Sequence, residues 1–273
     1  MMSRLQRIVI AYPSGNTTAL LFDPRQHEDR VALNAGIIRA WKAQAAGHLE
    51  IEQCCLVTQP RDPVAVTRVE MFGGEFCGNA ARSAAWIACG GDDCDGLIEV
   101  SGVELPLRFR VRDGRVAVEM PLPHIPGLVT PVAEGSVVRL NGIAHLVVDS
   151  EWGDVESAKA LLSKLALQGK YGLDEQPAVG VSRYDRQSGT ADFHVWVRRV
   201  ATLFDETACG SGTSAIGIAA AAASHSSVTL NVAQPSGESI ASEAKYSPLL
   251  GGVVSSAICG GVTVVYDGPL DLT

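Results

Sequence analysis

The sequence predicts an α+β fold with two similar domains and a cleft between them. Three observations support this prediction. Short strand-like segments outnumber helical ones along the 273 residues. A Cys-Gly dipeptide opens an Ala-rich helical segment once in each half, at Cys77 and at Cys209. These two cysteines are separated by close to half the chain, which indicates an old duplication.

The first half begins with strands and one helix. The stretch IVIAYPSGNTTALLFD predicts two short strands around a Pro-Ser-Gly-Asn turn. Residues 28–46 have helical periodicity and end at Gly47. The stretches LEIEQCCLV and PVAVTRVEM alternate like strands. The residues expected on the apolar side of the helix are Val31, Ala35, Ile38 and Trp41.

The first Cys-Gly helix is expected at about 78–90, where two glycines stop it. The stretches LIEVSG, ELPLRFRV and RVAVEM then predict strands, and Asp113-Gly114 between the last two is typical of a hairpin. The Pro-rich segment 121–127 is the best candidate for a linker between domains.

The second half repeats this style. Strands are expected at 136–149, 177–185 and 192–200, with helices at 154–168 and 210–223, and strands finish the chain. We therefore expect an N-terminal domain at 1–122 and a C-terminal domain at 123–261. The last strand, 262–273, is expected to pack on the N-terminal domain.

Composition excludes several classes of partner. The net charge is −8, which argues against nucleic acid, because such a partner requires a basic face. No stretch approaches the roughly 18 consecutive apolar residues of a transmembrane helix, and the N-terminus lacks the features of a signal peptide. We therefore expect a cytoplasmic protein with no membrane partner.

The seven cysteines are an odd number in a chain that does not look secreted, so we expect reduced thiols. No Cys or His cluster has zinc spacing, and no glycine-rich phosphate loop follows a strand, so no metal and no cofactor are expected. Apart from the two Cys-Gly sites, the cysteines are expected to be small core hydrophobes. These are Cys54, Cys55, Cys89, Cys94 and Cys259.

A thiol at a helix start has a chemical use. The first N–H groups of a helix have no intrahelical partner and form an anion site, and the same field lowers the pKa of a cysteine placed there. One such cysteine is weak support for a site, since a lone cysteine is usually a buried hydrophobe. Two of them suit inversion of a carbon centre, in which one group removes a proton and the other delivers one to the opposite face.

The two segments also resemble a known family. FCGNAARSAA and DETACGSGTSA are similar to the two cysteine motifs of the diaminopimelate epimerase and proline racemase superfamily, which acts without pyridoxal phosphate. SGN at 14–16 and GIAH at 142–145 resemble further segments of the epimerases, with Ala144 where proline is usual. The resemblance covers the whole chain, and the two cysteine motifs are its specific part.

The resemblance implies two pseudo-symmetric domains, each a barrel-like, mostly antiparallel sheet around a central helix, with the active site in the interdomain cleft. It implies Cys77 and Cys209 as the acid–base pair, with Asn16 and His145 lining the cleft. For His145 a purely structural role is an equal alternative. The resemblance also implies that backbone groups hold the α-carboxylate of the substrate. These belong to Gly78, Asn79, Gly210, Ser211 and Gly212.

The departures from the epimerase pattern bear on the substrate. Glu70 stands near the place where the epimerases have an asparagine, and no Glu-Arg pair precedes the second motif. The residues with which the epimerases hold the distal carboxylate of their substrate are therefore missing. The acidic residues near the motifs suit a neutral or cationic side chain instead. They are Glu70, Glu75, Asp205 and Glu206.

The PSGN and GGEFCGNA stretches are similar to those of histidine racemases from metallophore pathways. We therefore expect a cofactor-independent racemase of a small-molecule amino acid, with histidine favoured, and a homodimer as one arrangement. Diaminopimelate epimerase is the alternative enzyme, and Glu70 has the alternative role of a solvated charge at a strand end. A non-catalytic amino-acid-binding protein is the alternative of another class, although a binder has no need of both thiols. Facing thiols would also be open to oxidation.

Overall fold

The chain divides into two units. The structure, a computed structural model, describes residues 4–22, 29–44, 49–123 and 127–272. Unit 1 comprises Met1–Val116 and Gly261–Thr273, and unit 2 comprises Ala117–Gly260. The sequence-based limits after residues 122 and 261 lie a few residues away and remain a prediction. Helices and strands occur in both units, so the predicted α+β class is confirmed.

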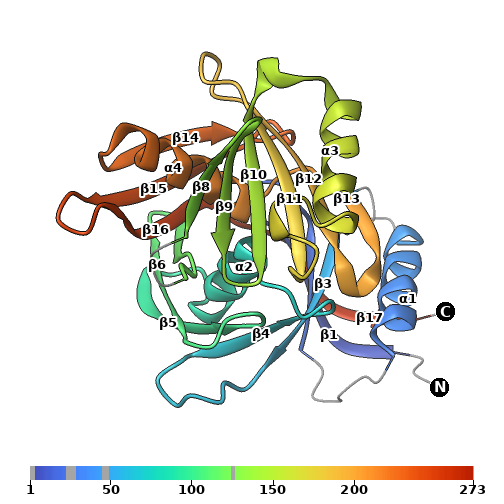
Figure 1. Cartoon of the computed structure of the whole chain (residues 1–273). Coiled ribbons are helices and arrows are strands. Elements are labelled where there is room, and N and C mark those ends of the chain that lie inside the picture. The colour runs from blue at the N-terminus through green and yellow to red at the C-terminus, as the bar shows by residue number, and fades with distance from the viewer. Residues whose placement is uncertain (1–3, 23–28, 45–48, 124–126, 273) are drawn as a thin grey trace. The chain divides into compact units, whose positions relative to one another are not determined.

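The strands of unit 1 lie in the order β6-β5-β4-β3-β2-β1-β17 (Figure 1). The pairs β2–β3 and β4–β5 are parallel, whereas β1–β17, β1–β2, β3–β4 and β5–β6 are antiparallel. The last strand of the chain therefore pairs with the first. The bounds are β1 (Arg4–Tyr12), β2 (Thr18–Leu21), β3 (Gln53–Thr58), β4 (Thr67–Met71), β5 (Cys94–Val100), β6 (Leu107–Arg112) and β17 (Thr263–Asp271).

Helix α1 (Arg30–Lys42) packs on this sheet through a face that the sequence predicted only in part. Asp29 caps its start by accepting a hydrogen bond from the amide of Ala32. Trp41 is buried as expected, but Val31 is 71% exposed. The buried face is Leu33, Ile37, Ala40 and Trp41, which pack with Leu5, Ile8 and Ile10 of β1. The predicted face was therefore wrong at Val31, because the helix is rotated to match the apolar surface of β1.

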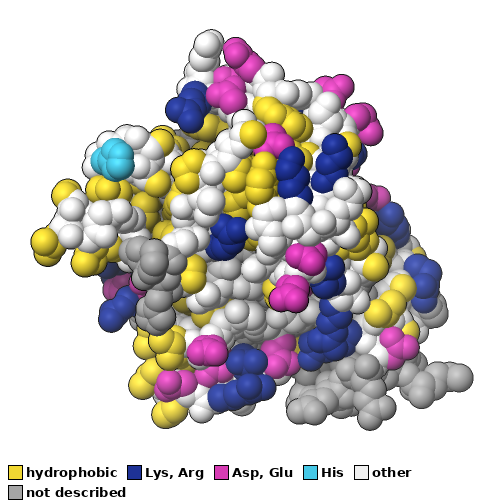
Figure 2. All heavy atoms as spheres, in the orientation of Figure 1, with side chains coloured by type: hydrophobic (Ala, Val, Ile, Leu, Met, Phe, Trp, Pro, Cys, Tyr) yellow, Lys and Arg dark blue, Asp and Glu magenta, His cyan; other side chains and the backbone are white. Residues whose placement is uncertain are grey.

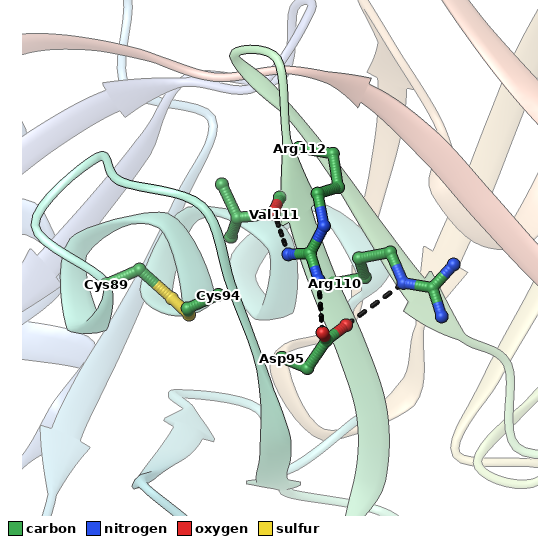
Figure 3. The surroundings of a disulfide bond; sticks show 6 residues. All are labelled: Cys89, Cys94, Asp95, Arg110, Val111 and Arg112. Carbon is green, nitrogen blue, oxygen red and sulfur yellow. Dashed lines mark hydrogen bonds and ion pairs between the residues drawn. A yellow bond between two sulfur atoms is a disulfide. The ribbon is translucent and has the colours of Figure 1, made fainter.

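Helix α2 (Gly78–Ala88) follows the first Cys-Gly dipeptide, and its first eight residues are all buried. Alanine, glycine and serine let this part of the helix lie in the interior, since they bring little volume. At its other end, Cys89 forms a disulfide with Cys94, the first residue of β5 (Figure 3). The expectation of reduced, core-buried thiols is therefore wrong for this pair, because the turn between α2 and β5 brings the two half-buried sulfurs together.

Asp95 lies next to the disulfide and bonds two arginines of β6. Its carboxylate accepts a hydrogen bond of 3.0 Å from Nε of Arg110 and another from Arg112 (Figure 3). The guanidinium groups hold the pKa of Asp95 below its usual range. Of the other cysteines expected in the core, Cys54 and Cys55 are buried and Cys259 is half-buried.

Unit 2 contains two sets of strands. One set has the order β13-β12-β11-β10-β9-β8, in which β10 and β11 are parallel, and the other has the order β14-β15-β16-β7. The chain passes from unit 1 to unit 2 within β7 (Arg115–Glu119). The other bounds are β8 (Val129–Val132), β9 (Gly135–Leu140), β10 (Ile143–Asp149), β11 (Ala178–Tyr184), β12 (Ala191–Val197), β13 (Thr202–Glu206), β14 (Val228–Ala233), β15 (Ser239–Ser247) and β16 (Gly252–Gly261).

Two helices cover the strands of unit 2. Helix α3 (Val155–Leu167) packs on β11 and β12 and carries a regular apolar stripe that includes Leu161, Leu162 and Leu165. Helix α4 (Gly210–Ser224) follows the second Cys-Gly dipeptide and is buried along most of its length. It has no polar face, as its Ala-rich sequence predicts for a helix surrounded by protein.

Most strands and helices were predicted within a few residues. Strand β8 was not predicted, and other differences are at ends: PVAVTRVEM becomes strand only from Thr67, and the strand expected at 192–200 ends at Val197. Residues Arg198–Val200 instead form a short 3-10 helix, as do Ser150–Trp152 and Lys170–Gly172. The expected helix stop at Gly47 and residues 124–126 of the expected linker lie outside the described residues.

None of the helices among the described residues combines the length and the apolar character needed to cross a membrane. Figure 2 shows acidic and basic side chains interspersed with apolar ones over the face that it presents. On the described part of that face, the positive charges therefore do not gather into one extended surface.

Two glycine-to-alanine substitutions are expected to have opposite effects on stability. In α4, a Cβ at Gly217 would lie 2.2 Å from Oγ and 3.1 Å from Cβ of the fully buried Ser242. Gly217→Ala should therefore lower the free energy of unfolding by about 1–3 kcal/mol. In α1, a Cβ at Gly36 meets no atom within 4 Å, so Gly36→Ala should raise it by up to about 1 kcal/mol. Urea denaturation of both variants checks this, and equal effects would contradict the close approach of α4 and β15.

Candidate active site

Cys77 is the N-cap of α2. Its backbone is extended, with φ −136° and ψ 113°, and its Sγ accepts a hydrogen bond of 3.4 Å from the amide of Ala80. The first intrahelical bond runs from the amide of Ala81 to the carbonyl of Cys77. The amides of Gly78 and Asn79 lie ahead of that bond, at the positive end of the helix. The half-buried thiol thus lies beside the two amides that the resemblance implies as ligands of the substrate α-carboxylate.

A chain of side chains leads away from the Cys77 thiol. Its Sγ donates to Oε1 of Gln53 at 3.1 Å, and Nε2 of Gln53 donates to Oγ1 of Thr18 at 2.7 Å. The Thr18 hydroxyl in turn donates to the carbonyl of Asn16 at 3.0 Å. The thiol is therefore connected through β3 and β2 to the Ser-Gly-Asn turn, and Gln53 fixes the direction of its proton.

The Ser-Gly-Asn turn has an uncommon backbone. Ser14, Gly15 and Asn16 all have positive φ, of 65°, 108° and 52°. Two non-glycine positions of this kind within three residues cost energy, and such local strain clusters at functional sites. Asn16 is also 2% exposed. The structure thus brings the predicted site residue Asn16 into the network that ends at Cys77.

A fully buried arginine joins this turn to α2. Nη2 of Arg82 donates to the carbonyl of Pro13 at 2.6 Å and to Oδ1 of Asn79 at 2.9 Å, and Nη1 donates to the carbonyl of Gly261 at 3.3 Å. These hydrogen bonds offset part of the cost of burying a guanidinium. Arg82 therefore holds the Ser-Gly-Asn turn, the chain before β17 and the start of α2 in one arrangement.

Glu70 occupies a different environment from the one expected. It accepts hydrogen bonds from Arg68 at 3.0 Å and from Arg30 at 3.1 Å, and Arg61 lies 3.7 Å away. Burial raises its pKa, but the hydrogen bonds and charges of Arg68 and Arg30 outweigh this and hold it below the usual value. The Glu70 carboxylate is thus hydrogen-bonded to two arginines, and its contact with a substrate remains a prediction.

Cys209 caps α4 as Cys77 caps α2. Its φ and ψ are −127° and 107°, and its Sγ accepts a hydrogen bond of 3.2 Å from the amide of Gly212. The first intrahelical bond runs from the amide of Thr213 to the carbonyl of Cys209. The amides of Gly210 and Ser211 therefore precede that bond, whereas the amide of Gly212 is already bonded to the sulfur.

His145 stands one step behind the Cys209 thiol. The Ser211 hydroxyl lies 3.4 Å from Cys209 Sγ and 2.9 Å from Nε2 of His145, and Nδ1 of His145 lies 3.1 Å from the Ser182 hydroxyl. The imidazole is fully buried, which lowers its pKa to about 3 and keeps it neutral. A Cβ at Gly180 would overlap the ring, so β11 leaves space for it. The described contacts give His145 the role of orienting Ser211.

The pKa of Cys209 lies well above its ordinary value. Burial is the largest cause, followed by the charge of Glu206 and a hydrogen bond with it, whereas the Ser211 hydroxyl and the Gly212 amide act in the opposite direction. The sequence-based expectation of a lowered pKa is therefore wrong for Cys209. The helix start does stabilise a thiolate, but a side chain that is 2% exposed loses more from desolvation.

Several residues of both networks escaped the sequence analysis. Gln53, Thr18, Arg82 and Ser182 act through contacts with residues distant in the sequence, as does Gln234, whose Oε1 accepts a 3.0 Å bond from the amide of Cys209. A polar residue next to an apolar strand segment, as at Gln53 and Gln234, is the only signal that could have found them. Among the described residues, no group of three or more His, Cys, Asp or Glu side chains could hold a metal ion.

Comparison with known proteins identifies relatives. A family model described as the histidine racemase CntK N-terminal domain matches residues 7–270. Two curated relatives from Fusobacterium nucleatum subsp. nucleatum, of strains ATCC 23726 and ATCC 25586, are both described as histidine racemase. They are 26% identical over 162 residues and 25% identical over 164 residues. Each alignment includes 55% of this chain, and the chain spans 60% and 61% of the length of the two relatives.

Solved structures share the fold. A probable proline racemase from Agrobacterium radiobacter K84, with bound carbonate, has a TM-score of 0.63 at 13% identity and covers 98% of this chain and 93% of its own. A hydroxyproline epimerase from Agrobacterium vitis, with bound trans-4-hydroxy-L-proline, has a TM-score of 0.61 at 13% identity, with coverages of 99% and 94%. The α+β fold of this chain is therefore similar to that of proline racemase-like proteins.

Removing the charge of Glu206 is expected to lower the pKa of Cys209. A neighbouring negative charge disfavours the thiolate, so Glu206→Gln should move the midpoint of thiolate formation to lower pH. The pH dependence of Cys209 alkylation by iodoacetamide, read by peptide mass spectrometry, measures that midpoint. A midpoint that stays in place or rises would contradict the contact between Glu206 and the thiol.

Proposed function

This chain belongs to the family of the histidine racemase CntK N-terminal domain, and from that membership we propose that it is a cofactor-independent amino-acid racemase. The observation that carries the proposal is the equivalent capping of α2 and α4. In each, a cysteine sulfur accepts the amide three residues later, and two further amides precede the first intrahelical bond. Two thiols, each beside an anion site of the same geometry, suit proton removal and proton delivery at one amino-acid α-carbon.

We propose that Cys77 and Cys209 act on opposite faces of the substrate in a cleft between the two units. One cysteine, as thiolate, removes the α-proton, and the other, as thiol, gives its proton to the opposite face. The protonation states of the two cysteines are then exchanged, so the next turnover runs in the reverse direction. The raised pKa of Cys209 suits the proton donor of this pair.

The substrate carboxylate would be bound by the amides of the two helix starts. Gly78 and Asn79 supply them in unit 1, and Gly210 and Ser211 in unit 2. As the α-proton leaves, negative charge spreads into the carboxylate, where helix N–H groups stabilise it more strongly than in the ground state. The pseudo-symmetric, diaminopimelate epimerase-like arrangement of the two domains is part of this proposal.

Histidine is the proposed substrate, converted between its L and D forms. Support comes from the family and from the two relatives described as histidine racemase. Arg198, an arginine upstream of the second cysteine motif, donates to the backbone carbonyls of Gln176 and Ala166 through Nε and Nη2. A distal carboxylate therefore has no partner in that guanidinium. A homodimer, a metallophore pathway and a cytoplasmic location also remain proposals, and of these the pathway rests on the resemblance.

Each active-site cysteine is expected to be essential. Cys77→Ala and Cys209→Ala should each reduce racemisation of L-histidine by at least about a hundredfold, the usual effect of removing an acid–base group. Polarimetry together with loss of the α-proton signal in deuterated water measures this. Cys259→Ala is the matched control, since Cys259 is a half-buried cysteine within β16 that does not cap a helix, and it should retain activity. Full turnover by either active-site variant would refute the two-thiol mechanism.

L-Histidine is expected to be a better substrate than diaminopimelate. A distal carboxylate left desolvated and unpaired costs several kcal/mol, about a hundredfold or more in kcat/KM. Loss of the α-proton in deuterated water, followed by NMR for both compounds, gives the two values. If diaminopimelate has the higher kcat/KM, the chain is an epimerase of that compound and the argument from the missing clamp is wrong.

A further inference from the structure

Strand β13 ends directly before the second cysteine motif and has two differently used faces. Its residues pair with β12, so that Asp205 lies opposite His194 and Glu206 lies opposite Phe193. Directly opposed residues of an antiparallel pair share a face, and successive residues alternate between faces. Asp205 and His194 therefore lie on one face of the sheet, and Glu206 and Phe193 lie on the other.

The face of Asp205 is bonded to helix α3. Nζ of Lys159 lies 2.7 Å from Oδ2 of Asp205, and Nδ1 of His194 lies 2.8 Å from its Oδ1. The other charged group near this cluster is Glu156, whose carboxylate is 3.9 Å from Nζ of Lys159. One carboxylate thus bonds β13 to a neighbouring strand and to a helix that the apolar core of unit 2 holds in place.

The face of Glu206 is turned to the start of α4. Phe193 packs there so closely that a Cβ at Gly212 would lie 2.4 Å from its ring. Glu206, beside Phe193, bonds to Cys209. The position of β13 therefore decides how closely Glu206 approaches the thiol, while β12 is fixed independently against α4 through Phe193.

We propose that Lys159, Asp205 and His194 form a clamp that fixes β13 and thereby holds Glu206 beside Cys209. Lys159 and Asp205 are then positioning residues for the acid–base cysteine, although neither faces it. The sequence placed Asp205 among the acidic residues that suit a cationic substrate side chain. Its carboxylate instead bonds to Lys159 and His194, on the face of the sheet opposite to Glu206. This inference rests on the proposed function only where it assigns the clamp to catalysis. The contact between Glu206 and Cys209 does not depend on that function.

Lys159→Met separates positioning from direct electrostatics, because the two give shifts of opposite sign. Loss of a positive charge would by itself disfavour the thiolate and raise the pKa of Cys209. Loss of the clamp instead frees β13, lets Glu206 move away and lowers that pKa. Lys159 and Asp205 are partly exposed, and ion pairs of this kind contribute little to stability, so the variant should fold.

The experiment measures the pH dependence of Cys209 alkylation by iodoacetamide, with peptide mass spectrometry to resolve each cysteine. In Lys159→Met and Asp205→Asn the midpoint should move to lower pH, as in Glu206→Gln, with alkylation at pH 8 faster by about threefold or more. Lys159→Arg should restore the original midpoint. In the Glu206→Gln background, Lys159→Met should not lower the midpoint further, because the clamp acts through Glu206.

Asp192→Asn is the matched control. Asp192 lies on β12, on the same face as His194, and its carboxylate pairs with Arg183 of β11 at 3.1 Å. Its removal should leave the Cys209 midpoint unchanged, and circular dichroism should show every variant folded. An equal shift in Asp192→Asn would mean a general loosening of the sheet and would overturn the proposal.

Two further outcomes would also overturn it. One is a midpoint that rises or does not move in Lys159→Met. The other is faster alkylation at every pH around an unchanged midpoint, which reports easier access to the sulfur. The alkylation test does not depend on catalysis. If the unsubstituted chain racemises no amino acid while the midpoint shifts as described, the proposed function fails and the clamp stands.

Discussion

The hydrogen bond from a helix amide to a cysteine sulfur is the interaction on which the site depends. An N-cap sulfur must reach the amide three residues later, so the cap residue has to be extended and the next residues small. At Cys77 and Cys209 the backbone angles meet this requirement almost identically. The bond places each thiol beside two further amides that precede the first intrahelical bond, without any additional side chain.

The surroundings make these two similar thiols chemically different. Cys77 is half-buried and donates its proton to a neutral amide oxygen of Gln53. Cys209 is buried against a carboxylate, with a neutral histidine orienting the hydroxyl beside it. In the proposed mechanism, such a pair starts with a preferred donor, and inversion in both directions requires that the proton can be exchanged between the two cysteines.

The parts that could be predicted from sequence are those with local causes. The Cys-Gly dipeptides predicted both helix starts, because capping involves residues within three positions of each other. The orientation of α1 was wrong at Val31, because β1 decides which side of the helix is buried. Gln53, Arg82 and the ion pairs of Glu70 depend on residues far apart in the sequence. The raised pKa of Cys209 could not be predicted either, since desolvation is set by the completed fold.

The pairing of β17 with β1 has a consequence for how the chain reaches its native state. Unit 1 is discontinuous, because unit 2 is inserted between β7 and β17. Leu270 and Tyr266 of β17 also complete the apolar cluster beneath Trp41. During synthesis, β1 therefore has an unpaired edge until more than 260 residues have been made. Unit 2 is continuous and ends before β17 begins, so the sheet of unit 1, from which the Cys77 network is built, is the last to have all of its strands available.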